Sequence, residues 1–457
     1  MAADRPIVII GAGPTGLGAA WRLNELGHAN WHLYEAADHA GGLAASFVDA
    51  AGFTWDVGGH VLFSHYKYFD DLMDTALGDQ WVEHIREAWV WMRDRWIPYP
   101  LQNNIWRLPE DELASCVEGL IEARANRGRG QQPASFRDWL LAGFGRGLCD
   151  TFLFPYNRKV WAYDPASLDV GWMGERVATV DVDRVLRNVE LRRDDVGWGP
   201  NSTFRFPLRG GTGAIWKAVS RRLPAERLHF NRRVDGVDTR ERLVRFAGGE
   251  TVAYEHLVSS MPLDTLLRSV DDRADLTEQA ARFLHSLSHI VGIGLRGQTP
   301  EPLKTKCWMY FPEAQVPFYR CTVFSNYSPH NVPSPGSTWS LIAEVSESPQ
   351  KPVNVSAVID EVVAGLEACR LVPDPSAIVS RWHTRVEYGY PTPWLGRDAV
   401  LTTVDAELRR AGIFSRGRFG AWKYEVSNQD HSVMQGVEAI DHILNGTPER
   451  TRYNMSS

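Results

Sequence analysis

The sequence predicts an α/β, Rossmann-like fold, and three observations near the N-terminus support that prediction. Ile7–Ile10 is an unbroken apolar run, which is typical of a strand buried on both faces of a parallel sheet. The loop GAGPTG follows at once, and Leu17–Leu26 then has the pattern of a helix that ends at Gly27. Trp31–Tyr34 has the pattern of a second strand.

Each glycine of this loop has a physical task. Gly11 makes the tight turn, Gly13 lets a pyrophosphate approach the backbone, and Gly16 lets helix and strand pack closely. The free N–H groups at the helix start would then bind the pyrophosphate. Glu35 ends the second strand, about twenty residues past the loop, where a carboxylate accepts a hydrogen bond from a ribose 2′-OH. Strand, loop, helix, strand and acid in register predict a dinucleotide site.

A second set of glycines indicates which dinucleotide binds. Gly41-Gly42 comes shortly after the acid and Gly58-Gly59-His60 follows, whereas a nicotinamide dehydrogenase needs no glycine pair there. In FAD enzymes of the glutathione-reductase type, a glycine pair after the acid lets the chain pass close to the cofactor. The pattern therefore favours FAD, and two ordinary glycine turns are the alternative.

The composition is that of a globular protein long enough for two or three domains. The chain has 457 residues, of which 44% are hydrophobic and 23% charged. Its net charge of −7 gives no reason to expect nucleic acid or an anionic membrane as a partner. We expect neither a signal peptide nor a membrane span. Five scattered cysteines without a Cys-x-x-Cys pair predict buried free thiols in the cytoplasm, with no metal site and no disulfide framework.

The remaining chain predicts two insertions into the α/β domain. Helical patterns fill much of residues 107–195, and aromatic and β-branched residues from about 290 to 386 predict an antiparallel sheet. Ala88–Trp96 is predicted as a strand and Gly436–Leu444 as the last helix. We expect an FAD-binding domain of discontinuous segments (1–80, 200–262 and 388–457), a helical nucleotide-binding insertion (106–198) and an antiparallel sheet domain (81–105 and 263–387). The substrate site is expected at the junction of these parts.

Long motifs in the chain resemble those of the UDP-galactopyranose mutases, specifically of the eukaryotic, fungal-type branch. They include WDVGGHVLFSHYKYFDD, WIPYPLQNNI, FPYNRKVWA, GERVA, WGPNSTFRFPLRGGTG, CWMYFPE, PFYRCTVFSNYSP, EVSES, GYPTP and SRGRFGAWKYEVSNQDHS, and the similarity covers essentially the whole chain. The resemblance implies an isomerase that interconverts UDP-galactopyranose and UDP-galactofuranose without net redox change. In that reaction N5 of reduced FAD attacks the anomeric carbon and UDP leaves, while NADPH or NADH serves as reductant.

A diphosphate leaving group needs cations and hydroxyl donors around it. The resemblance implies that Arg176 and Arg320 bind the diphosphate, since a planar guanidinium can contact two phosphate oxygens at once. For Arg176, an ion pair with Glu175 is the alternative. The positions of the family's phosphate-contacting tyrosines are occupied by Tyr310, Tyr327, Tyr390 and Tyr424. Core packing is the alternative for any one of them.

The resemblance also implies contacts to uridine, sugar and flavin. Tyr99 and Phe152 would enclose the uracil, and Gln102 and Asn157 would bond its edges, since amides offer both donor and acceptor. Trp161 and Asn201 match residues near the sugar or the phosphates. His60 matches a histidine against the flavin near N5, and we assign it to catalysis with Arg176 and Arg320. The implied FAD contacts are Gly11, Gly13, Gly16, Glu35, Gly42, Gly59, His60, Arg86, Arg418, Asn428 and Gln429.

Departures from the family's pattern leave alternatives open. Ala88, Leu101, Arg158 and Tyr388 differ from the residues usual there, so the same chemistry on another nucleotide sugar is one alternative. An FAD-dependent oxidase or desaturase is another, although it would need an apolar substrate tunnel in place of arginines and tyrosines. A flavin-binding protein without catalysis is a third. The expected partner is a UDP-sugar, and the oligomeric state is not predicted.

Overall fold

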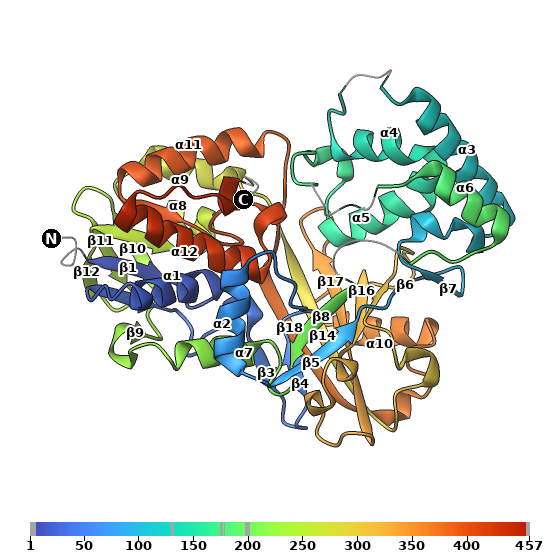
Figure 1. Ribbon diagram of the computed structural model, residues 1–457, viewed down its shortest axis with the longest axis horizontal. Coiled ribbons are helices and arrows are strands. Elements are labelled where there is room, and N and C mark those ends of the chain that lie inside the picture. The colour runs from blue at the N-terminus through green and yellow to red at the C-terminus, as the bar shows by residue number, and fades with distance from the viewer. Residues whose placement is uncertain (1–5, 129–131, 174–176, 178, 197–201, 454–457) are drawn as a thin grey trace.

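The computed structural model describes residues 6–128, 132–173, 177, 179–196 and 202–453. Figure 1 shows an α/β body that carries both chain ends, a group of helices beside it, and a mixed sheet between and below them. The α/β class predicted from the sequence is confirmed.

The α/β body is built on a parallel five-stranded sheet whose order is β19-β13-β1-β2-β9. The strands are β1 (Ile7–Ile10), β2 (Trp31–Tyr34), β9 (Leu228–His229), β13 (His256–Ser259) and β19 (Ile413–Ser415). Alternate side chains of β1 enter two different cores. Ile7 and Ile9 face the helices α1 (Pro14–Glu25), α2 (Lys67–Leu77), α7 (Gly213–Ser220) and α12 (Gln429–Asn445). Val8 and Ile10 face α8 (Leu263–Arg268), α9 (Ala274–Gln279) and α11 (Arg397–Arg410), so an unbroken apolar run is what this strand requires.

Three smaller sheets accompany this body. One contains β10 (Val234–Asp238), β11 (Leu243–Phe246) and β12 (Thr251–Ala253). The others are the pair β3 (Ser46–Val48) with β4 (Thr54–Asp56) and the pair β5 (Trp81–Ile85) with β8 (Thr203–Pro207).

The helical group contains α3 (Glu110–Asn126), α4 (Phe136–Leu148), α5 (Phe154–Trp161) and α6 (Val182–Leu191). A π-helical turn, Cys149–Leu153, connects α4 to α5. These helices share a buried core with residues from β6 and β7. Figure 1 shows the group set apart from the parallel sheet.

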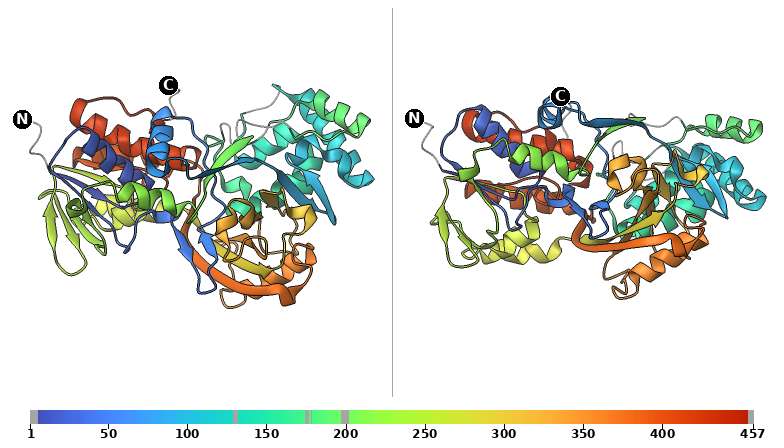
Figure 2. Two further views of the ribbon diagram at one scale, coloured as in Figure 1. Left: turned by 60° about the horizontal axis from the view of Figure 1, so that its bottom comes forward. Right: turned by 90° about the horizontal axis from the view of Figure 1, so that it is seen from below.

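A seven-stranded sheet, in the order β18-β14-β17-β16-β15-β6-β7, connects the two groups. It contains β6 (Ala88–Met92), β7 (Arg95–Pro98), β14 (His285–Arg296), β15 (Trp308–Tyr310), β16 (Arg320–Val323), β17 (Thr338–Glu347) and β18 (Ile378–Pro391). The helix α10 (Val358–Ala368) packs on it. The pairing of β15 with β6 is parallel and the others are antiparallel, as predicted for most of this sheet. Figure 2 shows β18, drawn in orange, sweeping along this sheet.

Two elements differ from the sequence-based prediction. Ala88–Trp96 forms a hairpin instead of a single strand, with Arg93 and Asp94 in the turn at φ 53° and 55°. The last helix, α12, begins at Gln429 and not at Gly436. In the described part of the chain, no helix is both long and apolar enough to cross a membrane. All five cysteines are buried with free thiols.

Candidate functional site

Two glycines of the loop between β1 and α1 are packed to different degrees. A Cβ on Gly16 would lie 1.8 Å from the carbonyl oxygen of Gly11, so strand and helix are in direct contact there. A Cβ on Gly13 would instead meet nothing nearer than 3.9 Å, and those atoms belong to Gly41 and Gly42. The two glycine segments therefore lie side by side at the N-terminus of α1, where a helix dipole favours an anion.

Glu35 fixes the shape of this loop. Its Oε2 accepts a hydrogen bond from the backbone N–H of Ala12 at 2.6 Å, and its Oε1 accepts one from Ala37 at 2.8 Å. A carboxylate oxygen accepts more than one hydrogen bond, so a ribose hydroxyl can still be bound. That role of Glu35 stays a prediction.

Glu344 is the central acid of the second part of the site, and it was not among the predicted site residues. It is buried on β17 opposite Arg320 of β16, whose Nε and Nη2 donate to its two oxygens at 2.7 and 2.8 Å. The backbone N–H of Gly59 and the hydroxyl of Tyr319 also donate to it, at 3.1 and 2.8 Å. Burial opposes the charge, yet Arg320 holds the pKa of Glu344 below its usual value, and the pKa of Arg320 is well above its own.

His60 follows this anchored turn. Burial lowers the pKa of its imidazole to about 4, against an opposing effect of Glu344, so the ring is neutral at physiological pH. Its Nδ1 is enclosed and has no hydrogen-bond partner within the described residues. A buried nitrogen of this kind is suited to a ligand that supplies the missing partner.

Arginines and aromatic rings surround Trp308. The guanidinium carbons of Arg86 and Arg320 lie 5.1 and 5.5 Å from its ring centroid. Its indole N–H is buried and has no acceptor among the residues the structure covers. The ring of Tyr99 lies 4.9 Å from that of Tyr310 and 5.9 Å from the Arg86 guanidinium. Trp308 was not predicted as a site residue, although its motif was recognised.

A second aromatic group adjoins the first. The Tyr424 ring lies 4.9 Å from Trp161 and 5.6 Å from Tyr390, and the Arg418 guanidinium lies 5.0 Å from Tyr390. Arg418 also donates to the Gly389 carbonyl at 2.9 Å. Burial raises the pKa values of Tyr390 and of Tyr310, so their hydroxyl groups keep the protons that they can donate.

The residues predicted for uridine lie on and near α5. Gln102 is buried, and its side-chain oxygen lacks a donor within the described chain. The Asn157 amide donates to the Leu153 carbonyl at 2.8 Å. The ring of Phe152 is stacked on Tyr156 at 5.4 Å with an interplanar angle of 10°. One face of Phe152 is thus covered by a residue that the sequence-based analysis did not consider.

Tyr327 is fully buried and packs against Phe204 and Phe206. Its hydroxyl group has no hydrogen-bond partner among the described residues. Two further predicted residues, Arg176 and Asn201, lie outside the described residues. The ligand contacts of all three stay predictions.

The start of α12 completes the site. Asn428 is its N-cap residue, and the Gln429 side-chain oxygen accepts from the Trp216 indole at 2.9 Å. Nδ1 of His65 lies 2.7 Å from Oδ2 of the buried Asp430. This contact connects the segment after His60 to the first turn of α12.

Comparison with known proteins identifies the family. The profile of flavin-containing amine oxidoreductases matches residues 14–438. A crystal structure of a reduced UDP-galactopyranose mutase superposes with a TM-score of 0.96 and 51% identity, covering 99% of this chain and 96% of the other. The chain belongs to the UDP-galactopyranose mutase family.

More distant proteins share the fold of this mutase family. Cyclohexylamine oxidase from Brevibacterium oxydans superposes with a TM-score of 0.68 at 15% identity, covering 97% of this chain and 99% of the oxidase. A 15-cis-phytoene desaturase from Glycine max is 40% identical over 81 residues. That match spans 17% of this chain and 14% of the desaturase, so it extends over a small part of either protein.

The residues present fit the flavin dinucleotide that the mutase family implies. Gly13 has no side chain that would keep a pyrophosphate from the backbone at the start of α1, and the Glu35 oxygens can still accept hydrogen bonds from hydroxyl groups. Nδ1 of His60 and the indole N–H of Trp308 are buried without hydrogen-bond partners among the described residues, so a bound group could supply those partners.

Proposed function

We propose that this chain is a flavin-dependent mutase that interconverts UDP-galactopyranose and UDP-galactofuranose without net redox change. When bound, reduced FAD would supply the nucleophile, its N5, for the anomeric carbon of the sugar. The observation that carries the proposal is the 51% identity to a reduced UDP-galactopyranose mutase over nearly the whole chain. The convergence of Arg86, Arg320 and tyrosines around Trp308 supports it, because a diphosphate needs such donors.

In this proposal the protein binds and orients the leaving group. Arg320 uses Nε and Nη2 for Glu344, so its Nη1 edge would face the diphosphate and stabilise the negative charge that develops on UDP. Tyr310, Tyr390 and Tyr424 would donate hydroxyl protons to phosphate oxygens. Arg176 and Asn201 would add a second cation and a sugar contact.

The other side of the site would bind uridine and flavin. Tyr99, Gln102, Phe152, Asn157 and Trp161 would hold the nucleotide. His60, kept neutral by burial, would lie against the flavin and accept or donate one hydrogen bond according to the flavin's redox state.

We propose NADPH or NADH as the reductant of the flavin. We also propose a cytoplasmic location for the protein and its membership of the fungal-type branch of the family.

We also propose an FAD-binding domain of the segments 1–80, 200–262 and 388–457, a helical nucleotide-binding insertion of 106–198, and an antiparallel sheet domain of 81–105 and 263–387. Within the last of these ranges, α8 and α9 pack against the parallel sheet and so belong to the FAD-binding body. Substrate contacts would come from more than one part, since Tyr99 and Gln102 precede the insertion and Tyr390 and Tyr424 lie in the last FAD-binding segment.

The test is anaerobic incubation of the dithionite-reduced protein with UDP-galactopyranose, followed by chromatographic detection of UDP-galactofuranose. We expect interconversion with the reduced flavin and none with the oxidised flavin. Binding of FAD and UDP without furanose formation would contradict the substrate and favour another UDP-sugar. A protein that binds neither FAD nor UDP would contradict the whole proposal.

A further inference from the structure

The loop Arg416–Gly420 follows β19 at the edge of the parallel sheet and touches two predicted binding regions. Gly417 has φ 89°, and a Cβ there would lie 2.2 Å from Oγ1 of Thr15, in the first turn of α1. Its backbone N–H donates to Oε1 of Gln435 at 2.9 Å. Arg418, one residue on, lies over the Tyr390 ring. A shift of this loop would therefore disturb both the dinucleotide loop and the tyrosines.

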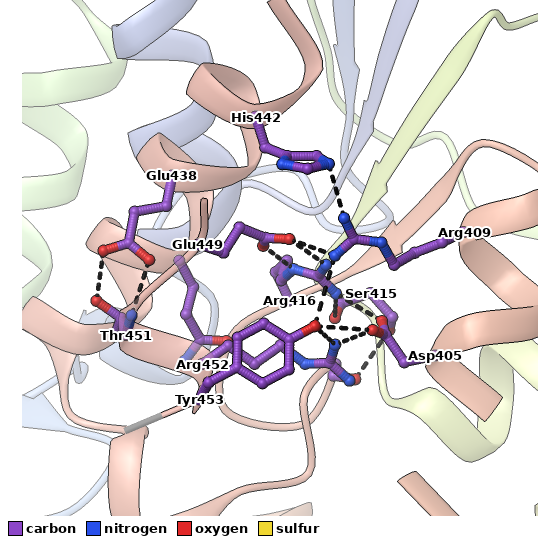
Figure 3. A network of polar contacts seen from close by, with 12 residues as sticks. Asp405, Arg409, Ser415, Arg416, Glu438, His442, Glu449, Thr451, Arg452 and Tyr453 are labelled. Atoms are coloured by element: carbon purple, nitrogen blue, oxygen red, sulfur yellow. Dashed lines mark hydrogen bonds and ion pairs between the residues drawn. The ribbon is translucent and has the colours of Figure 1, made fainter. Parts of the chain in front are cut away.

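Arg416 anchors the loop in a buried ion network (Figure 3). Its Nη2 donates to Oε1 of Glu449 at 2.8 Å, and its Nε pairs with the other oxygen of the same carboxylate. Its Nη1 donates to Oδ1 of Asp405 at 3.0 Å and to the Ser415 carbonyl at 2.8 Å. The guanidinium is fully buried, so its charge is tolerated only while these carboxylates accompany it.

Glu449 belongs to the segment Glu449–Tyr453, which we call the C-terminal latch. Arg409 of α11 donates to Oε1 of Glu449 at 2.8 Å, the same oxygen that accepts from Nη2 of Arg416 (Figure 3). The rest of the latch is fixed to α11 and α12 by several contacts. These are Thr451 N and Oγ1 to Glu438 at 2.9 and 2.8 Å, the ion pair of Arg452 with Asp405, and the Tyr453 hydroxyl to Asp405 at 3.3 Å.

We propose that the C-terminal latch positions the FAD and nucleotide-sugar site through the pair of positioning residues Glu449 and Arg416. This inference rests on the function proposed above. Glu449 holds Arg416, and Arg416 keeps Gly417 against Thr15 and Arg418 over Tyr390. Without the Glu449 carboxylate, the buried guanidinium retains a single carboxylate partner, and the loop moves so that water can reach it. Binding of FAD and substrate then weakens, although no residue that touches either of them has changed.

The experiment uses Glu449→Gln in the full-length chain. Flavin fluorescence titration of the apoprotein gives the Kd of FAD, and the anaerobic assay of the reduced holoenzyme gives KM and kcat. We expect the Kd of FAD to rise at least tenfold and KM for UDP-galactopyranose at least fivefold, with kcat at saturation within twofold of wild type. The matched control is Glu407→Gln, which is also a glutamate-to-glutamine change. Glu407 lies on α11 and its carboxylate pairs with Arg273 and Arg410 instead of with Arg416. It should leave all three constants within twofold of wild type.

Two further variants separate positioning from general stability. Arg416→Lys keeps the positive charge, but a single ammonium group cannot make the hydrogen bonds of the guanidinium to both Asp405 and Glu449. This variant should weaken FAD binding less than Glu449→Gln does. Arg416→Met combined with Glu449→Gln removes both charges and should recover FAD affinity relative to Glu449→Gln alone.

A lower melting temperature of Glu449→Gln with wild-type Kd and KM would overturn the proposal, since the latch would then only stabilise the fold. If Glu449→Gln does not fold, Arg416→Lys decides the question by the same constants. A wild-type chain that does not bind FAD contradicts the proposed function. If wild type and the folded variants all bind FAD with the same Kd, the proposed role of the C-terminal latch is contradicted and the proposed function is not.

Discussion

Arg320 is partly exposed and pairs with the buried Glu344, and the geometry of this pair limits how the arginine can act. The carboxylate occupies one edge of the guanidinium and also receives the backbone N–H of Gly59, next to His60. The same acid therefore orients the arginine proposed for the diphosphate and the turn proposed to face the flavin. Tyr319 supplies its hydroxyl as a further donor, which fixes the carboxylate itself.

Replacing Glu344 with glutamine should reveal the cost of leaving the partly buried Arg320 guanidinium without its carboxylate. We expect Glu344→Gln to lower the free energy of unfolding by about 2 kcal/mol, because a largely desolvated ion pair loses one partner while Arg320 keeps some contact with water. Urea unfolding of the holoprotein measures this. Asp360→Asn is the control, since Asp360 forms an exposed ion pair with Arg381, and it should cost less than about 1 kcal/mol. Equal effects of the two variants would contradict the role given to Glu344.

The protonation of His60 should appear in the pH dependence of stability. The imidazole has a pKa of about 4 in the folded chain against an ordinary value of 6.5. Above pH 6.5 it is neutral in both states, whereas between pH 6.5 and 4 only the unfolded chain takes up the proton. The free energy of unfolding should therefore fall as the pH is lowered through this range, by up to about 3 kcal/mol. In urea unfolding, the free energy of unfolding of His60→Asn should fall less steeply with decreasing pH than that of wild type. Identical pH dependence of the two proteins would contradict the low pKa of His60.

Two residues that depart from the family pattern have contacts within the protein, Leu101 as a buried residue and Tyr388 as a half-buried one. Leu101 is fully buried in the core of the helical group. The Tyr388 hydroxyl lies 2.8 Å from Thr265 and donates to Asp264 at 3.1 Å. Both residues therefore have contacts within the protein that explain their identity. They are weak evidence that the substrate carries a different sugar.

Among the elements, the first strand and helix depend most closely on one glycine. A methyl group on Gly16 would overlap the Gly11 carbonyl oxygen and would also lie 3.3 Å from the Ile9 side chain. A change in the spacing of strand and helix would therefore also move Gly13, which lies between these two glycines in the chain. The packing of this unit and the position of its proposed pyrophosphate site are linked in this way.

Substituting Gly16 with alanine should damage both packing and cofactor binding. We expect Gly16→Ala to lower the free energy of unfolding by about 2 kcal/mol or more, because overpacking a tight contact forces the backbone apart. Bound FAD, measured by flavin absorbance after purification, should fall with it. Gly143→Ala on α4 is the control, since a Cβ there meets nothing within 4 Å. That variant should be neutral or slightly stabilised, and retention of FAD by Gly16→Ala would contradict the prediction.

The elements that the sequence predicted well are those whose pattern is local. Ile7–Ile10 and Trp31–Tyr34 were predicted as strands, and their boundaries are confirmed. The start of α12 was missed because its first turns contain buried polar residues that have tertiary partners. Asp430 contacts His65, and Gln435 contacts the Gly417 N–H and the Val426 carbonyl. No periodicity of apolar residues can reveal such partners.

The same reasoning explains the missed hairpin and the missed site residues. Arg93 and Asp94 form a tight turn without the Asn-Gly or Asp-Gly signal that predicts one. Glu344 and Trp308 lay in recognised motifs. Their contacts with Arg320 and Arg86 depend on strand pairing and side-chain placement, which the sequence alone does not reveal. The contacts of the individual site residues with ligands stay predictions.

Across the whole molecule, the helical group is fixed to the seven-stranded sheet by polar contacts of α5. The buried Lys159 donates to the carbonyls of Glu313 and Val316, both at 2.9 Å, and burial lowers its pKa to about 7. Ser348 donates to the Ala162 carbonyl at 2.6 Å. These contacts join α5, which carries a predicted uridine residue, to the sheet, which carries predicted diphosphate residues.

Because the proposed cofactor site draws on segments from the entire chain, FAD should stabilise the fold as a unit. We expect the melting temperature of the apoprotein to rise with FAD concentration, by an amount equivalent to about 2.7 kcal/mol when free FAD is a hundred times its Kd. Differential scanning fluorimetry with increasing FAD measures this shift. ADP-ribose is a useful control because it lacks the isoalloxazine ring, and a shift as large as that with FAD would contradict the flavin contacts at His60 and α12.

The order of strands in the parallel sheet also has a consequence for biosynthesis. The neighbours of β1 are β2 and β13, and β13 in turn pairs with β19 near the end of the chain. A ribosome that adds roughly 5–20 residues per second therefore needs about 8–31 seconds between the end of β13 and the start of β19. During that interval β13 can pair with β1, but its other edge has no partner strand and leaves unpaired backbone groups open to association with other chains.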